Sequence, residues 1–210
     1  MTIAPVTIWG RPPSTNVKKA VWAAEELGVA YNFELSSGIH GRNDEIRAAG
    51  NPNGLVPTLV DGDFVLWESN AIVRYLAHKH GAGTPFFPDS PEARAAADKW
   101  LDWNGTFLKA VWDAFYLNVR AKDQYDAAKV KASAEAVAKV ITEIVEPTLK
   151  KQKYLSGDEF GFGDIALGAA AYLWFGGVPE SERIALPVFD EWYARVSARP
   201  AFKKAVAVPW

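Results

Sequence analysis

Two short stretches of the chain place polar side chains where a helix is expected to begin. Ser14, Thr15 and Asn16 stand at the start of one helical pattern, and Glu68-Ser69 stands at the start of another. The backbone N–H groups at a helix N-terminus attract anions, and a serine hydroxyl there can add a hydrogen bond. A carboxylate beside such an N-terminus suits a ligand that carries both charges of an amino acid. Ser14 and Ser69 equally suit plain N-cap residues, because serine often caps helices and does nothing else.

A small mixed sheet with helices is predicted to carry these residues. Its elements follow the order β-α-β-α-β-β-α and are expected at residues 6–9, 16–27, 31–35, 45–49, 58–60, 64–67 and 69–80. The first strand, the first helix and the second strand form a right-handed βαβ unit. Asp61-Gly62 is predicted as the turn of the hairpin, and Pro57 stands just ahead of its first strand. Proline cannot donate to a strand ladder, so Pro57 indicates a strand start, an edge or a bulge.

The chain beyond the sheet has helical patterns only. Residues 81–91, GAGTPFFPDSP, are rich in glycine and proline and are predicted to be a linker. Pro147 lies inside a helical pattern and predicts a kink or an early end there. Helices are expected at residues 92–120, 125–151, 164–175 and 187–198, with a short one from 201. The predicted fold class is therefore α/β plus all-α, with an α/β domain at 1–80 and an all-helical domain at 92–210.

The composition limits the function classes. The chain has 210 residues, of which 49% are hydrophobic and 23% charged, as in ordinary globular domains. The net charge of -2 gives no reason to expect a nucleic acid or an anionic membrane as partner. The opening MTIAPVTIWG lacks the pattern of a signal peptide, so a cytoplasmic protein is expected. The absence of cysteine excludes a thiolate nucleophile from this chain, and the three histidines leave little material for a metal site.

The ordered motifs of the chain resemble those of the cytosolic glutathione S-transferases. They are RPPSTN after the first strand, NPNGLVPTL, DGDFVLWESNAIVRYL, the proline-rich linker, FGFGDIALGAAAYLW and SARPAF. The resemblance is to serine-using branches of the theta, phi or zeta kind, of bacterial type. It implies a thioredoxin-like βαβαββα domain followed by an all-helical domain, usually as a cytoplasmic homodimer. It also implies glutathione as co-substrate, no metal, and transfer of small hydrophobic alkyl or aryl electrophiles to the glutathione thiol, as in detoxification.

The resemblance implies roles for several of these residues. In the family, the peptide bond that matches Val56–Pro57 is cis, which would turn the N–H and C=O of Val56 toward the cysteinyl backbone of glutathione. A serine at the place of Ser14 donates a hydrogen bond to the glutathione sulfur and favours the thiolate. Thr15 takes this role if the turn is wound differently, and Asn16 is a candidate second donor.

The remaining candidate contacts to glutathione come from four places along the chain. Ser69 would hold the γ-glutamyl carboxylate, and Glu68 would attract the ammonium group. Asn53 and His40 are candidates for the far end of glutathione, although His40 equally suits a solvated loop residue. Arg11 would add positive potential near the sulfur, or remain solvated.

An aromatic-rich segment is a candidate wall of the electrophile site. KWLDWNGTFLKAVWDAFY places Trp100, Trp103 and Phe107 along one helical face, a spacing that also suits a core or dimer contact. The candidate electrophile pocket consists of Trp9, Pro12, Trp103, Phe107 and Trp112.

Two other functions fit the same motifs. Glutathione-dependent peroxide reduction or isomerisation would use the same site, and a binding protein could hold glutathione without turnover. Reduction through a protein thiol, as in glutaredoxins, is disfavoured because the chain has no cysteine. The presence of Ser14 together with Glu68 and Ser69 favours an enzyme, because a pure scaffold needs none of them.

Overall fold

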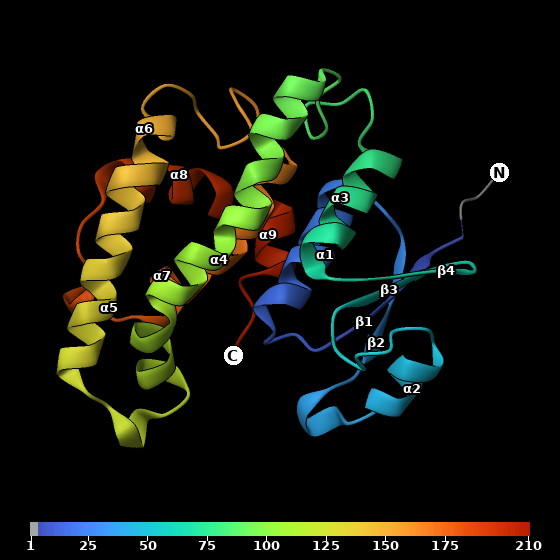
Figure 1. Cartoon of the computed structure of the whole chain (residues 1–210), viewed down its shortest axis with the longest axis horizontal. Helices are drawn as coiled ribbons and strands as arrows, with labels where there is room; N and C mark the ends of the chain where they lie inside the picture. Colours follow the sequence, from blue (N-terminus) through green and yellow to red (C-terminus); the bar gives the residue numbers. More distant parts are fainter. Residues whose placement is uncertain (1–3) are drawn as a thin grey trace. The chain divides into compact units, whose positions relative to one another are not determined.

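The computed structural model describes residues 4–210, which form two compact units (Figure 1). The first unit contains residues 4–87 together with Pro200–Trp210, and the second is Pro88–Arg199. The boundary falls within residues 81–91, where the linker is expected. The last residues differ from the expectation, because Pro200–Trp210 belongs to the first unit and not to the helical one.

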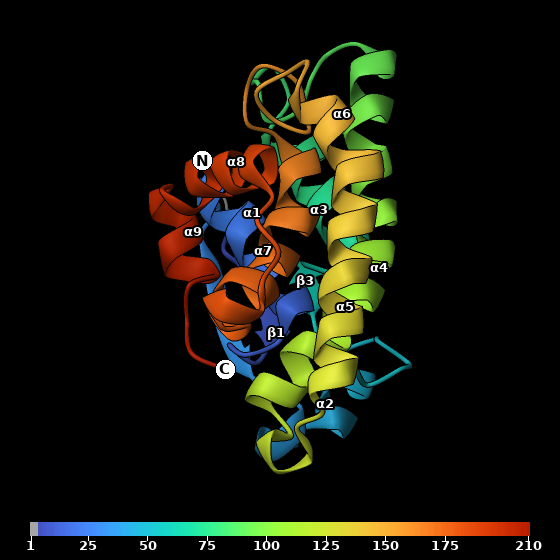
Figure 2. The ribbon, with the colours of Figure 1, turned by 90° about the vertical axis from the view of Figure 1, so that its left-hand side faces the viewer.

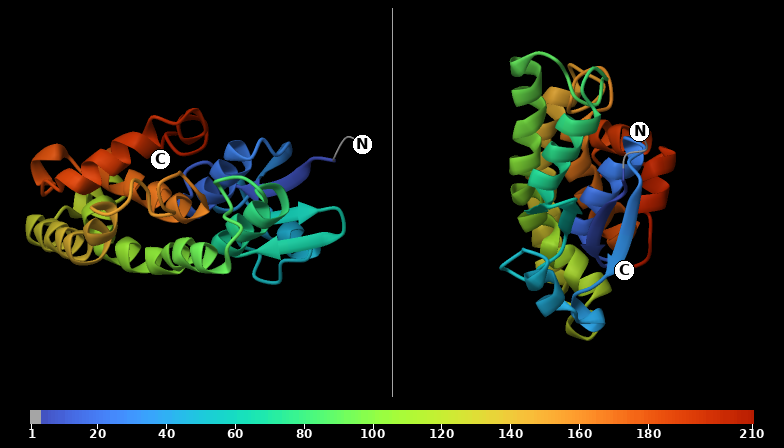
Figure 3. Two further views of the ribbon diagram at one scale, coloured as in Figure 1. Left: turned by 90° about the horizontal axis from the view of Figure 1, so that it is seen from above. Right: turned by 90° about the vertical axis from the view of Figure 1, so that its right-hand side faces the viewer.

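The first unit is built on a four-stranded sheet with the strand order β2-β1-β3-β4. The strands are β1 (Val6–Gly10), β2 (Tyr31–Leu35), β3 (Thr58–Asp61) and β4 (Phe64–Trp67). β1 is parallel to β2 and antiparallel to β3, and β3 is antiparallel to β4. Figure 3 shows β3 and β4 side by side. The predicted βαβ unit is thus present, with the hairpin on the other side of β1.

Four helices and a short 3-10 turn complete the first unit. They are α1 (Thr15–Glu26), η1 (Gly38–His40), α2 (Asn43–Ala48), α3 (Ser69–His80) and α9 (Pro200–Ala205). α1 packs against α3 and also against α9, which Figure 2 shows beside it. The rings of Trp22 in α1 and Phe202 in α9 meet edge to face with centroids 5.0 Å apart. The core of this unit therefore uses residues from both ends of the sequence.

The hairpin turn lies one residue later than predicted. Asp61 pairs with Phe64, so that Gly62 and Asp63 form the two-residue loop, and the predicted Asp61-Gly62 turn is wrong. Gly62 has a φ of 61°, and glycine at the first loop position is the arrangement of a type II′ turn. Asp61 consequently remains the last residue of β3.

The second unit is helical, as predicted. Its helices are α4 (Pro91–Val119), α5 (Ala127–Val140), α6 (Glu146–Leu149), α7 (Phe162–Gly177) and α8 (Pro187–Ser197), with 3-10 turns η2 (Lys122–Gln124) and η4 (Glu180–Glu182). α4 packs against both α5 and α7, and Figures 1 and 2 show α4 and α5 running side by side. None of the helices within residues 4–210 is long and apolar enough to cross a membrane.

Pro147 is accommodated by a wider helical turn. A π-helical segment, η3 (Ile141–Val145), joins α5 to α6, and Pro147 lies in the first turn of α6. Proline has no N–H to donate to the preceding turn, and its ring clashes with a normal α-helical carbonyl. The π turn relieves that clash by shifting the hydrogen-bond register. The predicted irregularity is therefore present, and helical structure continues through it.

A buried carboxylate organises the start of α7. Asp164 is fully buried and accepts hydrogen bonds from the N–H groups of Leu155 (2.8 Å) and Gly161 (3.3 Å) and from Trp192 Nε1 (2.9 Å). Burial raises the pKa of the Asp164 carboxyl, while these donors act in the opposite direction. Asp164, in the first turn of α7, thus caps the start of that helix. Its hydrogen bonds also connect α7 to α8 and to the loop that precedes α7.

Candidate functional site

A pocket of about 110 Å³ lies in the first unit, where the starts of α1 and α3 meet the loop before β3. Its lining consists of Asn16, Asn51, Asn53, Leu55, Val56, Pro57, Trp67, Glu68 and Ser69. Candidate residues from three separate stretches of the sequence are therefore brought together: Asn16, Asn53, Val56, Pro57, Glu68 and Ser69. Five of the nine lining residues have polar side chains, and polar groups of this kind fix the orientation of a bound ligand.

The loop before β3 is held in shape by an asparagine. The Val56–Pro57 peptide bond is cis, as predicted. Asn51 is buried, and its Nδ2 donates to Thr58 Oγ1 (2.7 Å) and to the carbonyl of Leu55 (3.0 Å). Its Oδ1 accepts from the N–H of Asn53 (3.0 Å). Asn51 was not predicted as a site residue, because an asparagine before a proline usually indicates an ordinary turn.

The N-terminus of α3 presents both of its predicted residues to the pocket. Ser69 is 7% exposed, and its hydroxyl donates to Asn16 Oδ1 (3.3 Å). Glu68 precedes the helix with φ 71° and ψ 114°, and the residue is exposed. The pocket therefore contains an anion-attracting helix end with a carboxylate next to it, which is the arrangement that an amino-acid zwitterion needs.

Ser14 is the N-cap of α1. Its backbone is extended, and its Oγ accepts a hydrogen bond from the Val17 N–H at 3.4 Å. A hydroxyl that accepts a bond keeps its own proton to donate, so capping and donation to a ligand are compatible. Thr15 is half-buried as the first residue of α1, and the exposed Asn16 lines the pocket.

Two predicted residues lie in the loop after β2 or beside it. His40 is exposed at the end of η1. Arg11 passes close to the same turn, since a Cβ at Gly38 would lie 3.5 Å from Arg11 Cδ. Neither residue lines the 110 Å³ pocket. Within residues 4–210, no three His, Asp or Glu side chains are grouped so that they could hold a metal ion.

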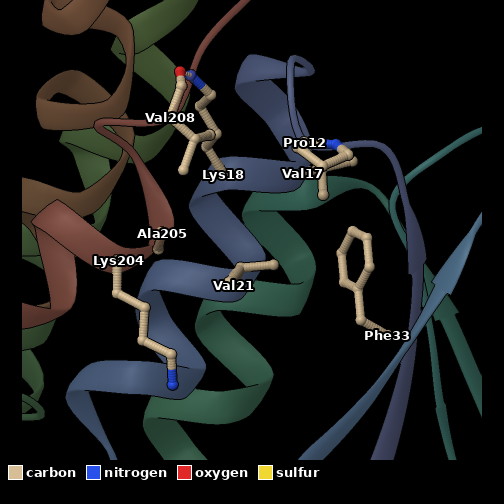
Figure 4. Close-up of a pocket in the computed structure, with 8 residues that line it drawn as sticks. All are labelled: Pro12, Val17, Lys18, Val21, Phe33, Lys204, Ala205 and Val208. Atoms are coloured by element: carbon tan, nitrogen blue, oxygen red, sulfur yellow. Dashed lines mark hydrogen bonds between the residues drawn. The ribbon is translucent and has the colours of Figure 1, made fainter.

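A second pocket of the first unit, about 150 Å³, contains one of the predicted electrophile contacts (Figure 4). Pro12 lines it together with Val17, Lys18, Val21, Phe33, Lys204, Ala205 and Val208. In Figure 4, Val21 lies between Phe33 on one side and the α9 residues on the other. The walls are mainly apolar side chains, so this pocket favours an apolar occupant.

Trp9 and Pro12 have different surroundings, although both were predicted to contact the electrophile. Side chains alternate along β1, with Ile8 buried and Trp9 on the opposite face of the sheet. The guanidinium of Arg42 lies over the Trp9 ring, 4.7 Å from its centroid.

The predicted aromatic residues of α4 also differ from one another. Phe107 has no exposed surface, and its ring centroid lies 6.0 Å from that of Phe189 within the helical unit. It is therefore a core residue and not a contact for the electrophile, and a core position was the alternative that its helical spacing left open. Trp103 is half-buried. Trp112 is 49% exposed and stacks on Tyr116 with centroids 5.6 Å apart.

Trp67 lines the pocket and Lys19 lies next to the lining residue Ser69, and neither was predicted. Trp67 lines the pocket at the end of β4. Lys19 is buried, and its Nζ lies 3.5 Å from Ser69 Oγ and 3.2 Å from Asn70 Oδ1. The sequence does contain a signal for it, because Lys19 follows Asn16 by three residues and such pairs share a helix face.

Known proteins match this chain over nearly its whole length. Family models for the glutathione S-transferase N-terminal and C-terminal domains match residues 4–78 and 106–200. Glutathione S-transferase GstB of Escherichia coli K12 is 41% identical over 210 residues, which cover 97% of this chain and 99% of the relative.

Solved structures agree with the sequence comparison. The theta class glutathione S-transferase of Xanthomonas axonopodis pv. citri, solved with glutathione bound, is 44% identical with a TM-score of 0.88, covering 98% of this chain and 99% of the other. Maize glutathione S-transferase I, in complex with an atrazine glutathione conjugate, is 26% identical with a TM-score of 0.82 over 97% of each chain. By sequence and by fold, this chain belongs to the glutathione S-transferase family.

Proposed function

We propose that this protein activates the thiol of glutathione as a thiolate and transfers small hydrophobic electrophiles to its sulfur. The observation that carries the proposal is the 110 Å³ pocket, in which the α3 N-terminus, the loop before Pro57 and the first turn of α1 converge. A protein 44% identical to this one was solved with glutathione bound, which supports the same ligand here.

The γ-glutamyl and cysteinyl parts of glutathione have candidate partners in the pocket. The N–H and hydroxyl of Ser69 suit the γ-glutamyl carboxylate, and the exposed carboxylate of Glu68 suits the ammonium group. The main chain of Val56 suits the cysteinyl backbone, in the manner of an added strand. Asn53, His40 and Arg11 stay candidates for the remaining contacts.

The hydroxyl of Ser14 is proposed to stabilise the thiolate without removing a proton. A thiol titrates at about 8.5, and lowering its pKa by about two units requires roughly 2.7 kcal/mol. A hydrogen bond to a charged sulfur contributes roughly 1.5–3 kcal/mol. The N-terminus of α1 adds about 0.3–1 kcal/mol. These contributions suffice together, so no general base is needed, and Asn16 or Thr15 can assist as further donors.

The proposed electrophile is apolar. The apolar pocket next to Pro12 supports this class of substrate, as does the atrazine conjugate held by the maize relative. Trp9, Trp103 and Trp112 stay candidate contacts for the electrophile. The homodimer and the cytoplasmic location that the family resemblance implies belong to the same proposal, and sedimentation velocity and cell fractionation measure them.

Removal of the Ser14 hydroxyl tests the proposed function. We expect Ser14→Ala to lower kcat for a halonitroarene by about tenfold or more, since a hydrogen bond to a charged group is lost. The KM for glutathione should change little, because the carboxylate and backbone contacts remain. Ser14→Gly is the matched variant, since glycine caps a helix nearly as well as serine. Both variants should therefore lose turnover equally while differing in thermal stability.

The ultraviolet absorbance of the thiolate gives an independent measurement. Bound glutathione should titrate well below free glutathione in the wild type and close to it in Ser14→Ala. Unchanged turnover in Ser14→Ala would assign the role to Thr15 or Asn16 instead, and Thr15→Ala is the control for that outcome. A wild-type protein whose bound glutathione titrates like the free thiol would be a binding protein and not a transferase.

A further inference from the structure

A third pocket, of about 300 Å³, lies in the helical unit and shares no lining residue with the two pockets of the first unit. It is formed by the first half of α5 (Figure 1) and by residues of η4 and just after it. The apolar part of its wall consists of Ala127, Val130, Ala134 and Ile184. Pockets that hold small molecules start at about this volume, so the size suits a small ligand.

Glu182 is held in a fixed orientation in the lining of this pocket. Its Oε2 accepts from Asn118 Nδ2 at 2.7 Å, and its Oε1 accepts from the Tyr125 hydroxyl at 2.9 Å. Asn118 Nδ2 also donates to the carbonyl of Ala114 in α4 (2.9 Å), which fixes the orientation of the amide. The hydrogen bond to Glu182 raises the pKa of the Tyr125 hydroxyl, so Tyr125 keeps the proton that it donates. A carboxylate has about four acceptor sites, so each oxygen of Glu182 retains one for a ligand.

Within residues 4–210, no lysine, arginine or histidine forms an ion pair with Glu182. The side-chain groups that donate to it, those of Asn118 and Tyr125, are both neutral and leave its negative charge in place. Glu182 is half-buried, so part of the water that would stabilise this charge is excluded. A ligand that carries a positive charge would therefore interact favourably with it.

The other charged residues of the lining have contacts of their own. Lys131 and Glu135 form an ion pair with each other, with 3.9 Å between Nζ and Oε1. The guanidinium carbon of Arg183 lies 5.3 Å from the ring centroid of Phe175, which is not part of the lining, and its buried Nε has no hydrogen-bond partner among the described residues. A ligand carboxylate would compete with that contact of Arg183, whereas an ammonium group would meet a carboxylate that is already oriented.

We propose that this pocket binds a small organic amine with an apolar body, and that the ammonium group of the amine donates a hydrogen bond to Glu182. The body would cover the side chains of Tyr125 and Ile184, which are 47% and 40% exposed. The Tyr125 ring also attracts cations through its π electrons. This site contains none of the residues that line the 110 Å³ pocket, so the inference does not depend on the proposed function.

The test uses three probes that share an apolar body and differ in charge. They are 2-phenylethylamine, 2-phenylethanol and 3-phenylpropanoate, and ligand-observed NMR titration of the full chain at pH 7 measures their dissociation constants. We expect the amine to bind about tenfold or more tightly than the alcohol, because hydrogen bonds between charged groups are the strong ones. The carboxylate should bind no better than the alcohol. Saturating S-methylglutathione should leave the dissociation constant of the amine unchanged.

Matched variants locate the site. Glu182→Gln should weaken the amine by about tenfold and leave the alcohol nearly unchanged. Glu180→Gln removes the same charge from an exposed residue of η4 outside the lining, and it should bind all three probes as the wild type does. Ala127→Leu serves if Glu182→Gln does not fold, since it narrows the pocket from an exposed position and should weaken the amine several-fold. Ala128→Leu, at the exposed neighbour outside the lining, is its control.

Four outcomes would overturn the inference. The first is an amine that binds no better than the alcohol, or does not bind at all. The second is tighter binding of the carboxylate, which would assign the pocket to anions and to Arg183. The third is wild-type affinity for the amine in whichever of Glu182→Gln and Ala127→Leu folds. The last is displacement of the amine by S-methylglutathione, which would place the amine in the 110 Å³ pocket.

Discussion

Glu68 has a backbone conformation that L-residues rarely adopt. Its φ of 71° lies in the left-handed region, at the junction between β4 and α3. A residue without a special side-chain requirement would usually be glycine there, because other residues are destabilised by about 1–3 kcal/mol. Glu68 lines the 110 Å³ pocket, which is consistent with its proposed contact to the ammonium group of glutathione.

Substitutions at Glu68 separate the backbone from the carboxylate. We expect Glu68→Gly to be more stable than Glu68→Ala by about 1 kcal/mol, since only glycine adopts this φ without a steric cost. Both variants should raise the KM for glutathione, because the partner of its ammonium group is lost. Urea unfolding measures the first effect and steady-state kinetics the second. Equal stability of the two variants would show that the junction is not strained.

The charge of Glu68 has its own control. Glu68→Gln keeps the length of the side chain and its backbone conformation, and removes only the charge. It should raise the KM for glutathione as Glu68→Ala does, while the free energy of unfolding stays close to that of the wild type. A KM equal to the wild-type value would exclude an electrostatic role for the carboxylate.

At the scale of elements, Asp61 connects the hairpin to α3. Its Oδ2 accepts from the Tyr75 hydroxyl (2.7 Å) and from Lys79 Nζ, both on α3. The hydrogen bond from Lys79 and the smaller one from Tyr75 lower the pKa of Asp61. This contact exists because the hairpin turn lies at Gly62 and Asp63, which leaves Asp61 at the end of β3 and close to α3.

The contact predicts a pH-dependent loss of stability. We expect Asp61→Asn to lower the free energy of unfolding at pH 7, because the ion pair with Lys79 is lost. The loss should be only about 1 kcal/mol, since Lys79 is partly exposed and solvent weakens the pair. The folded-state pKa of Asp61 is below the unfolded value of about 3.9. The stabilisation is therefore present above that value and is lost as the pH falls through the folded pKa. Urea unfolding of both proteins between pH 7 and pH 3 should show the difference shrinking below about pH 4.

Tyr75→Phe is the matched control for Asp61. It removes one hydrogen bond and no charge, so its destabilisation should vary less with pH over the same range. If Asp61→Asn differs from the wild type by the same amount at both ends of the range, the pH dependence does not come from this carboxylate.

At the scale of the whole molecule, the two ends of the chain share one core. Phe202 is buried against Trp22, and Lys18 Nζ donates hydrogen bonds to the carbonyls of Val206 and Val208. The first unit therefore requires residues that follow the helical unit in sequence. We therefore expect its stability to depend on the C-terminal segment, although the 110 Å³ pocket is lined by other elements.

This shared core predicts the effect of a substitution far along the chain from the sheet. We expect Phe202→Ala to lower the free energy of unfolding by about 3–5 kcal/mol, as for other buried phenylalanines. Lys203→Ala, at an exposed neighbour, should change it by less than about 0.5 kcal/mol. Urea unfolding measures both. A loss below about 1 kcal/mol for Phe202→Ala would mean that α9 contributes little to the first unit.

Local patterns in the sequence determined the order of the elements and where several of them begin. Ser14 caps α1, α3 starts at Ser69, and the helix around Pro147 is irregular, all as predicted. Each of these features depends on residues within about one helical turn, so that spacing and residue type are sufficient to identify them. The hairpin was predicted for the same reason, and its turn was placed one residue early because both Asp-Gly and Gly-Asp satisfy the local rule.

Only the tertiary structure decided which buried faces meet. A helical period indicates that a face of α1 is buried, but it does not say that Lys19 meets Ser69 while Lys18 meets the carbonyls of Val206 and Val208. These partners lie 50 or more positions away, and their contact depends on how α1, α3 and α9 pack. The same holds for the separate surroundings of Trp9 and Pro12. Such contacts follow from long-range packing, where the free energy of burial is shared by many residues and is not visible in any one stretch of sequence.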